Sequence, residues 1–324
     1  MPVPIQRGFV LVATLWILAV ITIAASYFAE RVGHSIAQTQ QKQETTDQLI
    51  AFANTRADIL FRLGTSPLSP AGLGQPAIAL DNRPYRGSGA DIVRLQDERG
   101  LLNLNFVDRA VMLRFLGEMG VPPEKRDAMI DTLLDYTDPD NLRRLNGAEA
   151  AEYRALDLPP PPNDLLASPY QLKNVIGWRD QEDLWKDQRV LRFLSTSRIN
   201  GFNPNTAPLE LLASLPGGNR EIAAALIKLR WEKPLYTVGQ LENVTGGFMD
   251  SDFFLYFPGS SIRITHQSKK IPWALQYSLT LTPRSESAPW RIDYHVKTAI
   301  PYPSENVNKF IVTSEQTSAA SDSD

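Results

Sequence analysis

Five carboxylates gather around a turn that follows a predicted helix, at Asp135, Asp138, Asp140, Glu149 and Glu152. Their oxygen ligands suit Ca²⁺ better than a transition metal. The stretch lacks the ligand period and the glycine of an EF-hand. Asp138 and Asp140 are the strongest candidate ligands, and Asp135 and Glu149 complete the candidate set. The alternative is an acidic, solvated helix end and turn that binds no ion.

Side chains for catalysis do not form a recognisable constellation. The three histidines, His34, His266 and His295, have no spacing that suggests a metal triad or a nucleophile–base pair. The sequence has no phosphate loop of the Gly-x-x-x-x-Gly-Lys type. It also has no cysteine, which excludes disulfides, a thiolate nucleophile and cysteine-ligated zinc. We therefore expect a protein that is not an enzyme; an enzyme would need a pocket with converging titratable groups.

Length and charge limit the remaining classes. With 324 residues, the chain can bury one large core or two modest ones. Lys and Arg number 33 against 36 Asp and Glu, which gives a formal net charge of −3. No global basic field would therefore recruit nucleic acid, and we expect none as a partner.

Residues 9–29 are free of charge and begin an unusually long predicted helix. At about 1.5 Å per residue, this run spans roughly the 30 Å of a bilayer's hydrocarbon core. It is longer than the apolar region of a secretory signal. Residues 30–63 contain helix formers and no proline, so the helix continues beyond the membrane. Arg7, the only charge before the span, places the N-terminus inside.

The rest of the sequence predicts a sheet interrupted by helices. Residues 64–90, rich in Gly, Pro and Ser, read as a loop. Two short strands at 91–96 and 101–105 flank Asp97-Glu-Arg-Gly100, which has hairpin chemistry. The pattern predicts four further strands, and a disordered tail follows from 306 to 324. These strands are expected at 253–257, 261–265, 273–281 and 290–298.

The sequence between about 103 and 257 repeats itself. Asn-x-Asn occurs at 103–105 and again at 203–205, each time ahead of a leucine-rich helix and a Gly/Pro turn. Both copies close with Gln-Leu-x-Asn-Val-x-Gly, at 171–177 and 240–246. Such a repeat predicts two copies of one helical unit that pack through equivalent faces, and the alternative is chance similarity among leucine-rich helices.

Each copy resembles the helix-hairpin-helix module of competence-type DNA-binding proteins. In such modules a Gly-rich turn presents backbone N–H groups to a DNA phosphate. The second copy, 203–244, has Asn219 in place of the usual second glycine and Ile222 where a basic residue is usual. The first has prolines at 122–123, which remove N–H donors. A membrane-tethered DNA-binding protein is therefore the alternative function, and a packing scaffold is the favoured interpretation.

Three motifs resemble the minor pseudopilin K family of type II secretion. Arg7-Gly8 followed by Phe9 and an apolar helix is similar to the class III leader of pilins and pseudopilins. Most of those proteins have Glu at the fifth mature position, here Ala13, and pseudopilin K is the exception. The segment DERGLLNLN at 97–105, and the Asp-rich turn followed by Gly-Ala-Glu and Tyr, also resemble pseudopilin K proteins. An ordinary signal anchor is the alternative for the leader alone.

The resemblance implies both a function and a processing site. Prepilin peptidase would cleave between Gly8 and Phe9, and Phe9 would become the methylated N-terminus. The protein would sit at the tip of a periplasmic pseudopilus with pseudopilins I and J, above the major pseudopilin, anchored once in the inner membrane. There it would support export through the outer-membrane secretin. The family's helical domain is known to bind calcium, which agrees with the carboxylates.

The expected fold is α+β, with a long N-terminal helix on an antiparallel pilin-like sheet and a large helical insertion that contains two helix-hairpin-helix-like repeats. The expected boundaries are a leader at 1–8, a transmembrane segment at 9–29, its periplasmic continuation at 30–63, sheet at 64–105 and 253–300, the insertion at 106–252, and the tail at 306–324.

Overall fold

The computed structural model describes residues 7–299 and 308–311. The chain forms two units, Met1–Ile50 and Ala51–Asp324, and the division falls inside the long helix α1 (Arg7–Thr65). Most of the predicted leader, at 1–6, and most of the predicted tail, at 306–307 and 312–324, lie outside the described residues.

The first unit is the N-terminal part of α1. Its most apolar window has a mean hydropathy of 2.2 and is not covered by any other part of the described chain. The hydroxyls of Thr14 and Thr22 donate to the backbone oxygens of Leu11 and Leu18, at 2.9 and 2.8 Å. The polar groups of these two threonines are thus satisfied within the helix, as lipid requires. By length and composition, α1 suits a single membrane anchor.

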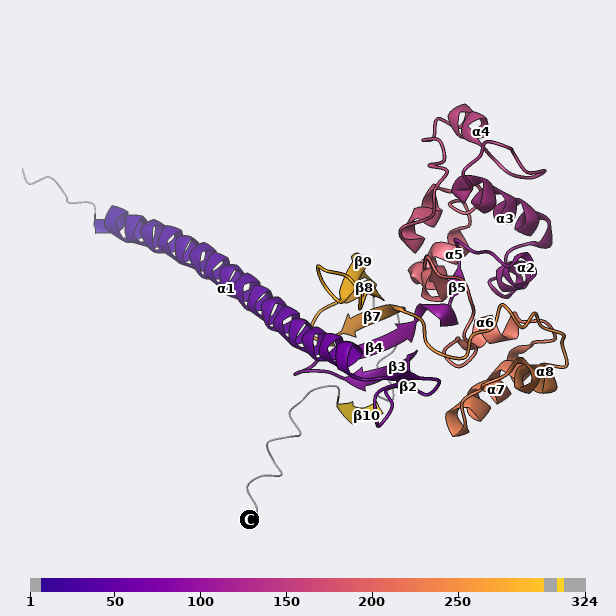
Figure 1. Cartoon of the computed structure of the whole chain (residues 1–324). Coiled ribbons are helices and arrows are strands. Elements are labelled where there is room, and N and C mark those ends of the chain that lie inside the picture. The colour runs from indigo at the N-terminus through magenta and orange to yellow at the C-terminus, as the bar shows by residue number, and fades with distance from the viewer. Residues whose placement is uncertain (1–6, 300–307, 312–324) are drawn as a thin grey trace, which may run out of the picture. The chain divides into compact units, whose positions relative to one another are not determined.

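The second unit is built on a six-stranded sheet with the order β10-β3-β4-β7-β8-β9 (Figure 1). Its neighbours are antiparallel, except that β10 runs parallel to β3. The strands are β3 (Asp81–Arg86), β4 (Ile92–Asp97), β7 (Ser261–Gln267), β8 (Ala274–Leu281), β9 (Trp290–Thr298) and β10 (Asn308–Ile311).

The last turns of α1 pack on this sheet. Ile59 and Leu63 lie in one apolar core with Val93 and Leu95 of β4 and with Ile264 of β7. Their spacing of four residues puts Ile59 and Leu63 on the same face of the helix. The predicted packing of the long helix on an antiparallel sheet is confirmed.

Three buried polar side chains, those of Asp91, His266 and Tyr277, form hydrogen bonds beneath the same part of α1. Nδ1 of His266 is 2.7 Å from Oδ2 of Asp91, and Nε2 of His266 bonds the hydroxyl of Tyr277. Phe52 of α1 stacks on the His266 ring, with 5.2 Å between centroids. His266 therefore has a structural environment inside the core.

The insertion is a group of short helices (Figure 1), and its buried side chains form a second, larger core. Leucines dominate it, together with the fully buried Trp178 and Tyr153. Trp178 donates from Nε1 to the backbone oxygen of Met129 at 2.5 Å, which satisfies its polar atom. The α-helices are α2 (Arg109–Glu118), α3 (Pro123–Thr137), α4 (Ala150–Ala155), α5 (Glu182–Trp185), α6 (Leu209–Ala213), α7 (Arg220–Glu232) and α8 (Val238–Thr245). The 3₁₀ helices are η1 (Glu98–Gly100), η2 (Pro169–Asn174) and η3 (Lys186–Phe193).

The predicted hairpin at 97–100 is wrong. These residues turn the chain out of the sheet through η1, and β5 (Leu102–Asn103) pairs in parallel with β6 (Leu194–Ser195) instead. The cause is the buried Asp97 carboxylate, which accepts from Asn203 Nδ2 and Thr206 Oγ1, both at 2.9 Å, and from the Gly259 N–H at 2.9 Å. Asp97 thereby ties the sheet to the insertion.

Three further expectations about strands need correction. Residues 253–257 form no strand but a single bridge between Phe254 and Phe202. The predicted loop at 64–90 contains β1 (Leu68–Ser69), β2 (Gly72–Leu73) and β3, whose register is irregular near Pro84. Residues 308–311 of the predicted disordered tail are the strand β10. Aromatic content misled the first prediction, and Pro, Gly and Ser misled the second.

Candidate metal centre

Asp135 and Asp138 lie at the C-terminal end of α3, and both contact Arg144. The Asp135 side chain is fully buried; Nη1 of Arg144 lies 2.6 Å from its Oδ1, and the Arg144 backbone N–H donates to Oδ2 at 3.1 Å. The same guanidinium lies 2.5 Å from Oδ2 of Asp138. Asp135 therefore holds the loop through Arg144, while Asp138 keeps a second, buried oxygen without a hydrogen-bond partner among the described residues.

Three of the four predicted ligands converge. Asp138, Asp140 and Glu149 each offer an oxygen, and these oxygens lie within 4.8 Å of one another. Calcium binds oxygens at about 2.3–2.6 Å, so two ligands of one ion are separated by at most about 5 Å. The observed spacing fits one Ca²⁺ between these three carboxylates, and Asp135 is not part of the group.

Glu149 is the residue whose environment most requires a cation. It is 5% exposed, and neither carboxylate oxygen has a hydrogen-bond partner among the described residues. Burial raises the pKa of its carboxyl, and the nearby charges of Asp135, Asp138 and Asp140 raise it further. A buried carboxylate without a partner is unfavourable, and a divalent cation would relieve that cost.

Gly147 lets the loop close over Asp135. A Cβ at this position would lie 1.9 Å from Oδ2 of Asp135, so only glycine fits. The Gly-Ala-Glu motif thus has a geometric basis: the glycine permits the approach, and the glutamate two residues later enters the cluster.

Sequence reasoning missed two residues that shape this loop. Arg144 neutralises Asp135 and Asp138, as described above. Asn163 donates from Nδ2 to the backbone oxygen of Asp140 at 2.7 Å, across 23 positions of sequence. Arg144 follows the acidic turn closely in sequence, so an ion pair between them could have been predicted. Nothing in the sequence indicated Asn163.

The two predicted repeats use their asparagines identically. The backbone N–H groups of Asn105 and Asn205 donate to Asn103 Oδ1 and Asn203 Oδ1, both at 3.0 Å. The side-chain oxygens of Asn105 and Asn205 each accept a backbone N–H at 2.8 Å, from Leu166 and Leu235. The closing glycines, Gly177 and Gly246, both have positive φ. The two halves are therefore locally alike.

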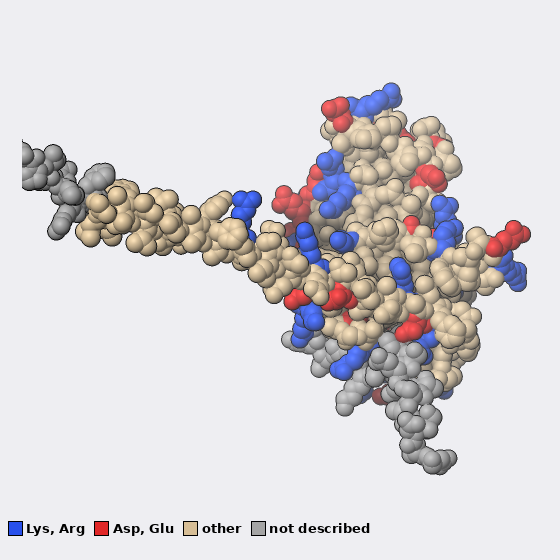
Figure 2. All heavy atoms as spheres, turned by 90° about the vertical axis from the view of Figure 1, so that its left-hand side faces the viewer, with Lys and Arg blue, Asp and Glu red and all other residues tan. Residues whose placement is uncertain are grey.

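The turns between the paired helices do not resemble phosphate sites. The left-handed residue of the second turn is Gly217, with φ +69°, while Asn219 is extended and caps α7 by accepting the Ile222 N–H at 2.9 Å. Glu124 and Glu221 lie in the first turns of α3 and α7, where they repel anions. Figure 2 shows both signs of charge interspersed over one face. The DNA-binding alternative receives no support.

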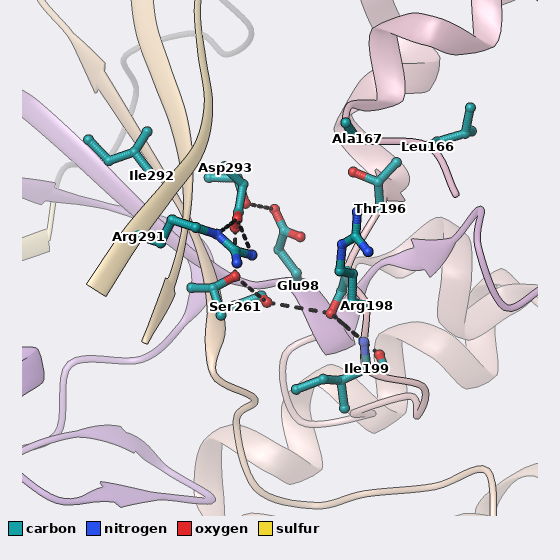
Figure 3. A pocket seen from close by; sticks show the side chains of 13 residues that line it. Glu98, Leu166, Ala167, Thr196, Arg198, Ile199, Ser261, Arg291, Ile292 and Asp293 are labelled. Atoms are coloured by element: carbon teal, nitrogen blue, oxygen red, sulfur yellow. Dashed lines mark hydrogen bonds and ion pairs between the residues drawn. The ribbon is translucent and has the colours of Figure 1, made fainter. Parts of the chain in front are cut away.

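A second hollow lies between the sheet and residues 196–199 (Figure 3). It has a volume of about 380 Å³ and is lined by hydroxyls, by charged groups and by apolar side chains that include Leu166, Ile199 and Ile292. Buried Glu98 accepts from Ser278 at 2.7 Å and from Ser195 at 2.8 Å, and Asp293 accepts from Thr280 at 2.6 Å. The hydroxyls of Ser195, Ser278 and Thr280 thus donate to carboxylates and link neighbouring parts of the chain.

The arrangement is an α+β fold in which the end of a long helix packs on a mainly antiparallel sheet that is interrupted by a helical insertion. The family model described as type II secretion system (T2SS), protein K, matches residues 95–184. That segment includes Asp97, the carboxylate cluster and Gly147. No curated protein was found to match the chain.

A solved structure gives an independent comparison. The chain is similar to one chain in the crystal structure of the GspK-GspI-GspJ complex from the type 2 secretion system of enterotoxigenic Escherichia coli. The TM-score is 0.55 at 14% identity, with 82% of this chain and 99% of that chain covered. At this identity the likeness concerns the fold. The family match over residues 95–184 and this likeness of fold both agree with the predicted resemblance to type II secretion protein K.

Proposed function

We propose that this protein is the minor pseudopilin that caps the pseudopilus of a type II secretion system, together with pseudopilins I and J. The observation that carries the proposal is the protein K match over 95–184, where the sheet passes into the insertion. Prepilin peptidase cleaves after Gly8, and Phe9 becomes the methylated N-terminus. The anchor lies in the inner membrane, and the body lies in the periplasm.

The capping role follows from two features of the chain. Ala13 stands where other pseudopilins carry a glutamate, and a glutamate without a subunit above it would be costly in lipid. The insertion, with its own large core, adds bulk to the pilin-like sheet. A subunit with this helix packs among the anchors of the major pseudopilin below it, while its bulk prevents addition above it.

The cluster supports calcium binding as part of this function. Asp138, Asp140 and Glu149 would hold the ion, and Asp135 would position the loop through Arg144. A bound Ca²⁺ supplies positive charge to the buried oxygens of Glu149 and ties the end of α3 to the start of α4. The ion thus has a structural role in the insertion.

We further infer that the two locally alike halves of the insertion are copies of one helix-hairpin-helix-like unit kept as a packing scaffold. Their matching asparagine hydrogen bonds and closing glycines support this inference. The acidic first turns of α3 and α7 argue against phosphate binding.

Assembly with I and J gives a direct test. The full chain is expressed in detergent-solubilised form with pseudopilins I and J of the same secretion system, and the mixture is fractionated by size. A ternary complex that needs all three proteins is the expected result. Elution of this chain alone, while I and J associate with each other, would contradict the proposed position.

A further inference from the structure

We propose that a groove on the insertion binds a partner protein through a segment with an apolar face and Lys or Arg residues. The groove lies between α3, α4 and residues 176–181, and its volume is about 690 Å³. A second hollow of about 360 Å³ shares Lys125, Asp180 and Gln181 with it and extends to α5. The two hollows are therefore neighbours on the surface of the insertion.

The floor of the groove is apolar and mostly small. Ala128 and Met129 come from α3, Ala148 from the loop before α4, and Ile176 and Gly177 from the far side. Small side chains allow another backbone to approach closely, and an amphipathic helix typically docks by laying its apolar face into such a floor. Leu156, which is 59% exposed, adds an apolar contact at the rim.

The rim is acidic. Glu124, Glu152 and Asp180 line the groove, and Glu182 and Asp183 line its extension. Lys125 is the only basic residue among the described lining residues of either hollow.

Part of this acidity is already neutralised. Glu152 pairs with Arg143 at 3.2 Å, and Asp180 lies 3.7 Å from Arg179. Within residues 7–299, Glu124, Glu182 and Asp183 form no ion pair at 4.0 Å or less. Glu182 and Asp183 also line a hollow with Lys173, Arg179 and Lys186, so Glu124 is the one of these three carboxylates that lies outside that basic set. An occupant that carries basic residues beside its apolar face would complement these carboxylates.

Charge also argues against two other occupants of the groove, which are the C-terminal residues of this chain and a nucleic acid. Residues 312–324 carry Glu315, Asp322 and Asp324 but no Lys or Arg, so the chain's own end would be repelled. A nucleic acid would be repelled by the same rim. The acidic rim and apolar floor instead suit a segment of another protein that carries Lys or Arg beside an apolar face. This inference goes beyond capping by I and J, and it depends neither on bound calcium nor on a place at the filament tip.

The test uses the full chain in phosphatidylcholine nanodiscs, with empty nanodiscs as the blank. The probe is a labelled helical peptide of about 18 residues, with leucine and alanine on one face and lysine on the other, and its twin has glutamate for lysine. We expect the lysine peptide to bind at least about tenfold more tightly, and its affinity to fall as salt rises from about 0.05 to about 0.5 M.

Variants locate the binding. The double change Glu124→Lys and Asp180→Lys is expected to weaken binding of the lysine peptide by at least about tenfold. Ala128→Trp fills the floor and should abolish binding. Glu286→Lys, an exposed charge change between β8 and β9, should leave it unchanged. Circular dichroism checks that each variant is folded.

Two results would overturn the proposal. One is equal binding of the two peptides to the unaltered chain, a comparison that needs no variant to fold. The other is an unchanged affinity for the lysine peptide in Ala128→Trp or in the double variant, with Glu286→Lys as the reference. The peptide would then bind somewhere other than the groove.

Discussion

At the scale of single residues, Glu149 is the most informative side chain in the molecule. Its two buried oxygens lack partners among the described residues, and its position beside Asp138 and Asp140 gives a cation a place to bind. Arg144 already balances part of the surrounding negative charge. The burial of Glu149 therefore favours the proposed ion site over an acidic, solvated turn.

Replacing Glu149 tests this role. Glu149→Gln is expected to lower calcium affinity by at least about tenfold, because it removes a charged ligand while keeping the shape. Calcium should raise the thermal midpoint of the unaltered protein but hardly that of the variant. Titration calorimetry and thermal unfolding in the presence of calcium or a chelator provide the measurements.

The matched control for Glu149 is Asp157→Asn. Asp157 is exposed and has φ +56°, a conformation that asparagine also tolerates. This change removes one negative charge just after α4 without altering a cluster residue, so calcium affinity should stay the same. Equal losses of calcium affinity in both variants would mean that calcium binding depends only on the overall negative charge of the protein.

Gly147 provides a second test at this scale. Gly147→Ala forces a Cβ against the buried Asp135 carboxylate, and it should destabilise the protein by about 1–3 kcal/mol. Gly239→Ala, inside α8 where a Cβ meets nothing within 4 Å, should instead stabilise it by about 0.5–1 kcal/mol. Urea unfolding compares the two; a Gly147 variant as stable as the Gly239 variant would show that the loop is not closed over Asp135.

The cluster shows what sequence can and cannot provide at residue scale. Carboxylate types and their spacing were enough to place Asp138, Asp140 and Glu149 in one candidate cluster, and the structure brings these three together. The sequence could not predict that Asp135 lies apart from the other three carboxylates. That separation depends on which carboxylate oxygens pair with Arg144. The contact of Asn163 with Asp140 depends on how the chain between them folds back.

At the scale of elements, an ion pair joins the sheet to the second half of the insertion. Asp81 of β3 lies 3.7 Å from Arg230 of α7, and both side chains are 5% exposed. Arg230 also donates to the backbone oxygens of Pro204 and Ala207, at 2.8 and 2.6 Å. Arg83 donates two hydrogen bonds to the same carboxylate, and its Cζ lies 5.2 Å from the centroid of the Trp231 ring.

Asp81→Asn should therefore destabilise the protein by about 3–5 kcal/mol at neutral pH, because it leaves Arg230 buried without its carboxylate. Urea unfolding at pH 7 measures the loss. Glu286→Gln, on the exposed hairpin loop, is the control and should change little. A loss no larger than that of the control would contradict the role of this pair.

The Asp81 carboxylate also determines part of the way in which the free energy of unfolding depends on pH under acidic conditions. Burial would raise the pKa of Asp81, but the hydrogen bond and charge of Arg83 and the charge of Arg230 outweigh it and hold the pKa below its usual value. A lowered pKa contributes stability above the unfolded value of about 4, and this contribution is lost as pH falls through the folded pKa. The free energy of unfolding should therefore fall less steeply below about pH 4 in Asp81→Asn than in the unaltered protein.

Strands with a long, regular pattern were predicted well, and short ones were not. The alternation in 261–265, 273–281 and 290–298 corresponds to β7, β8 and β9. The turn at 97–100 has good hairpin residues, yet tertiary hydrogen bonds to Asp97 direct the chain elsewhere. β3 contains a proline and was missed, because local propensity reports poorly on a strand held by its neighbours.

At the scale of the whole molecule, the apolar segment and the helix-on-sheet packing follow from hydrophobic pattern alone. A charge-free run long enough for a bilayer and a stripe of apolar residues at helical spacing suffice for both. The insertion was predicted because the late strands were expected to complete the sheet begun at 91–105, with the helical units between them. Its groove was not, because Ala128, Ala148 and Gly177 converge only in the folded chain.

The central claim is that this chain is a processed minor pseudopilin, and its N-terminus tests that claim most directly. The mature protein is isolated from cells with and without prepilin peptidase, and its mass and N-terminal sequence are determined. The account predicts a chain that begins with methylated Phe9, and loss of this processing when the peptidase is absent. An intact Met1, or a cut near Ala29, would contradict it.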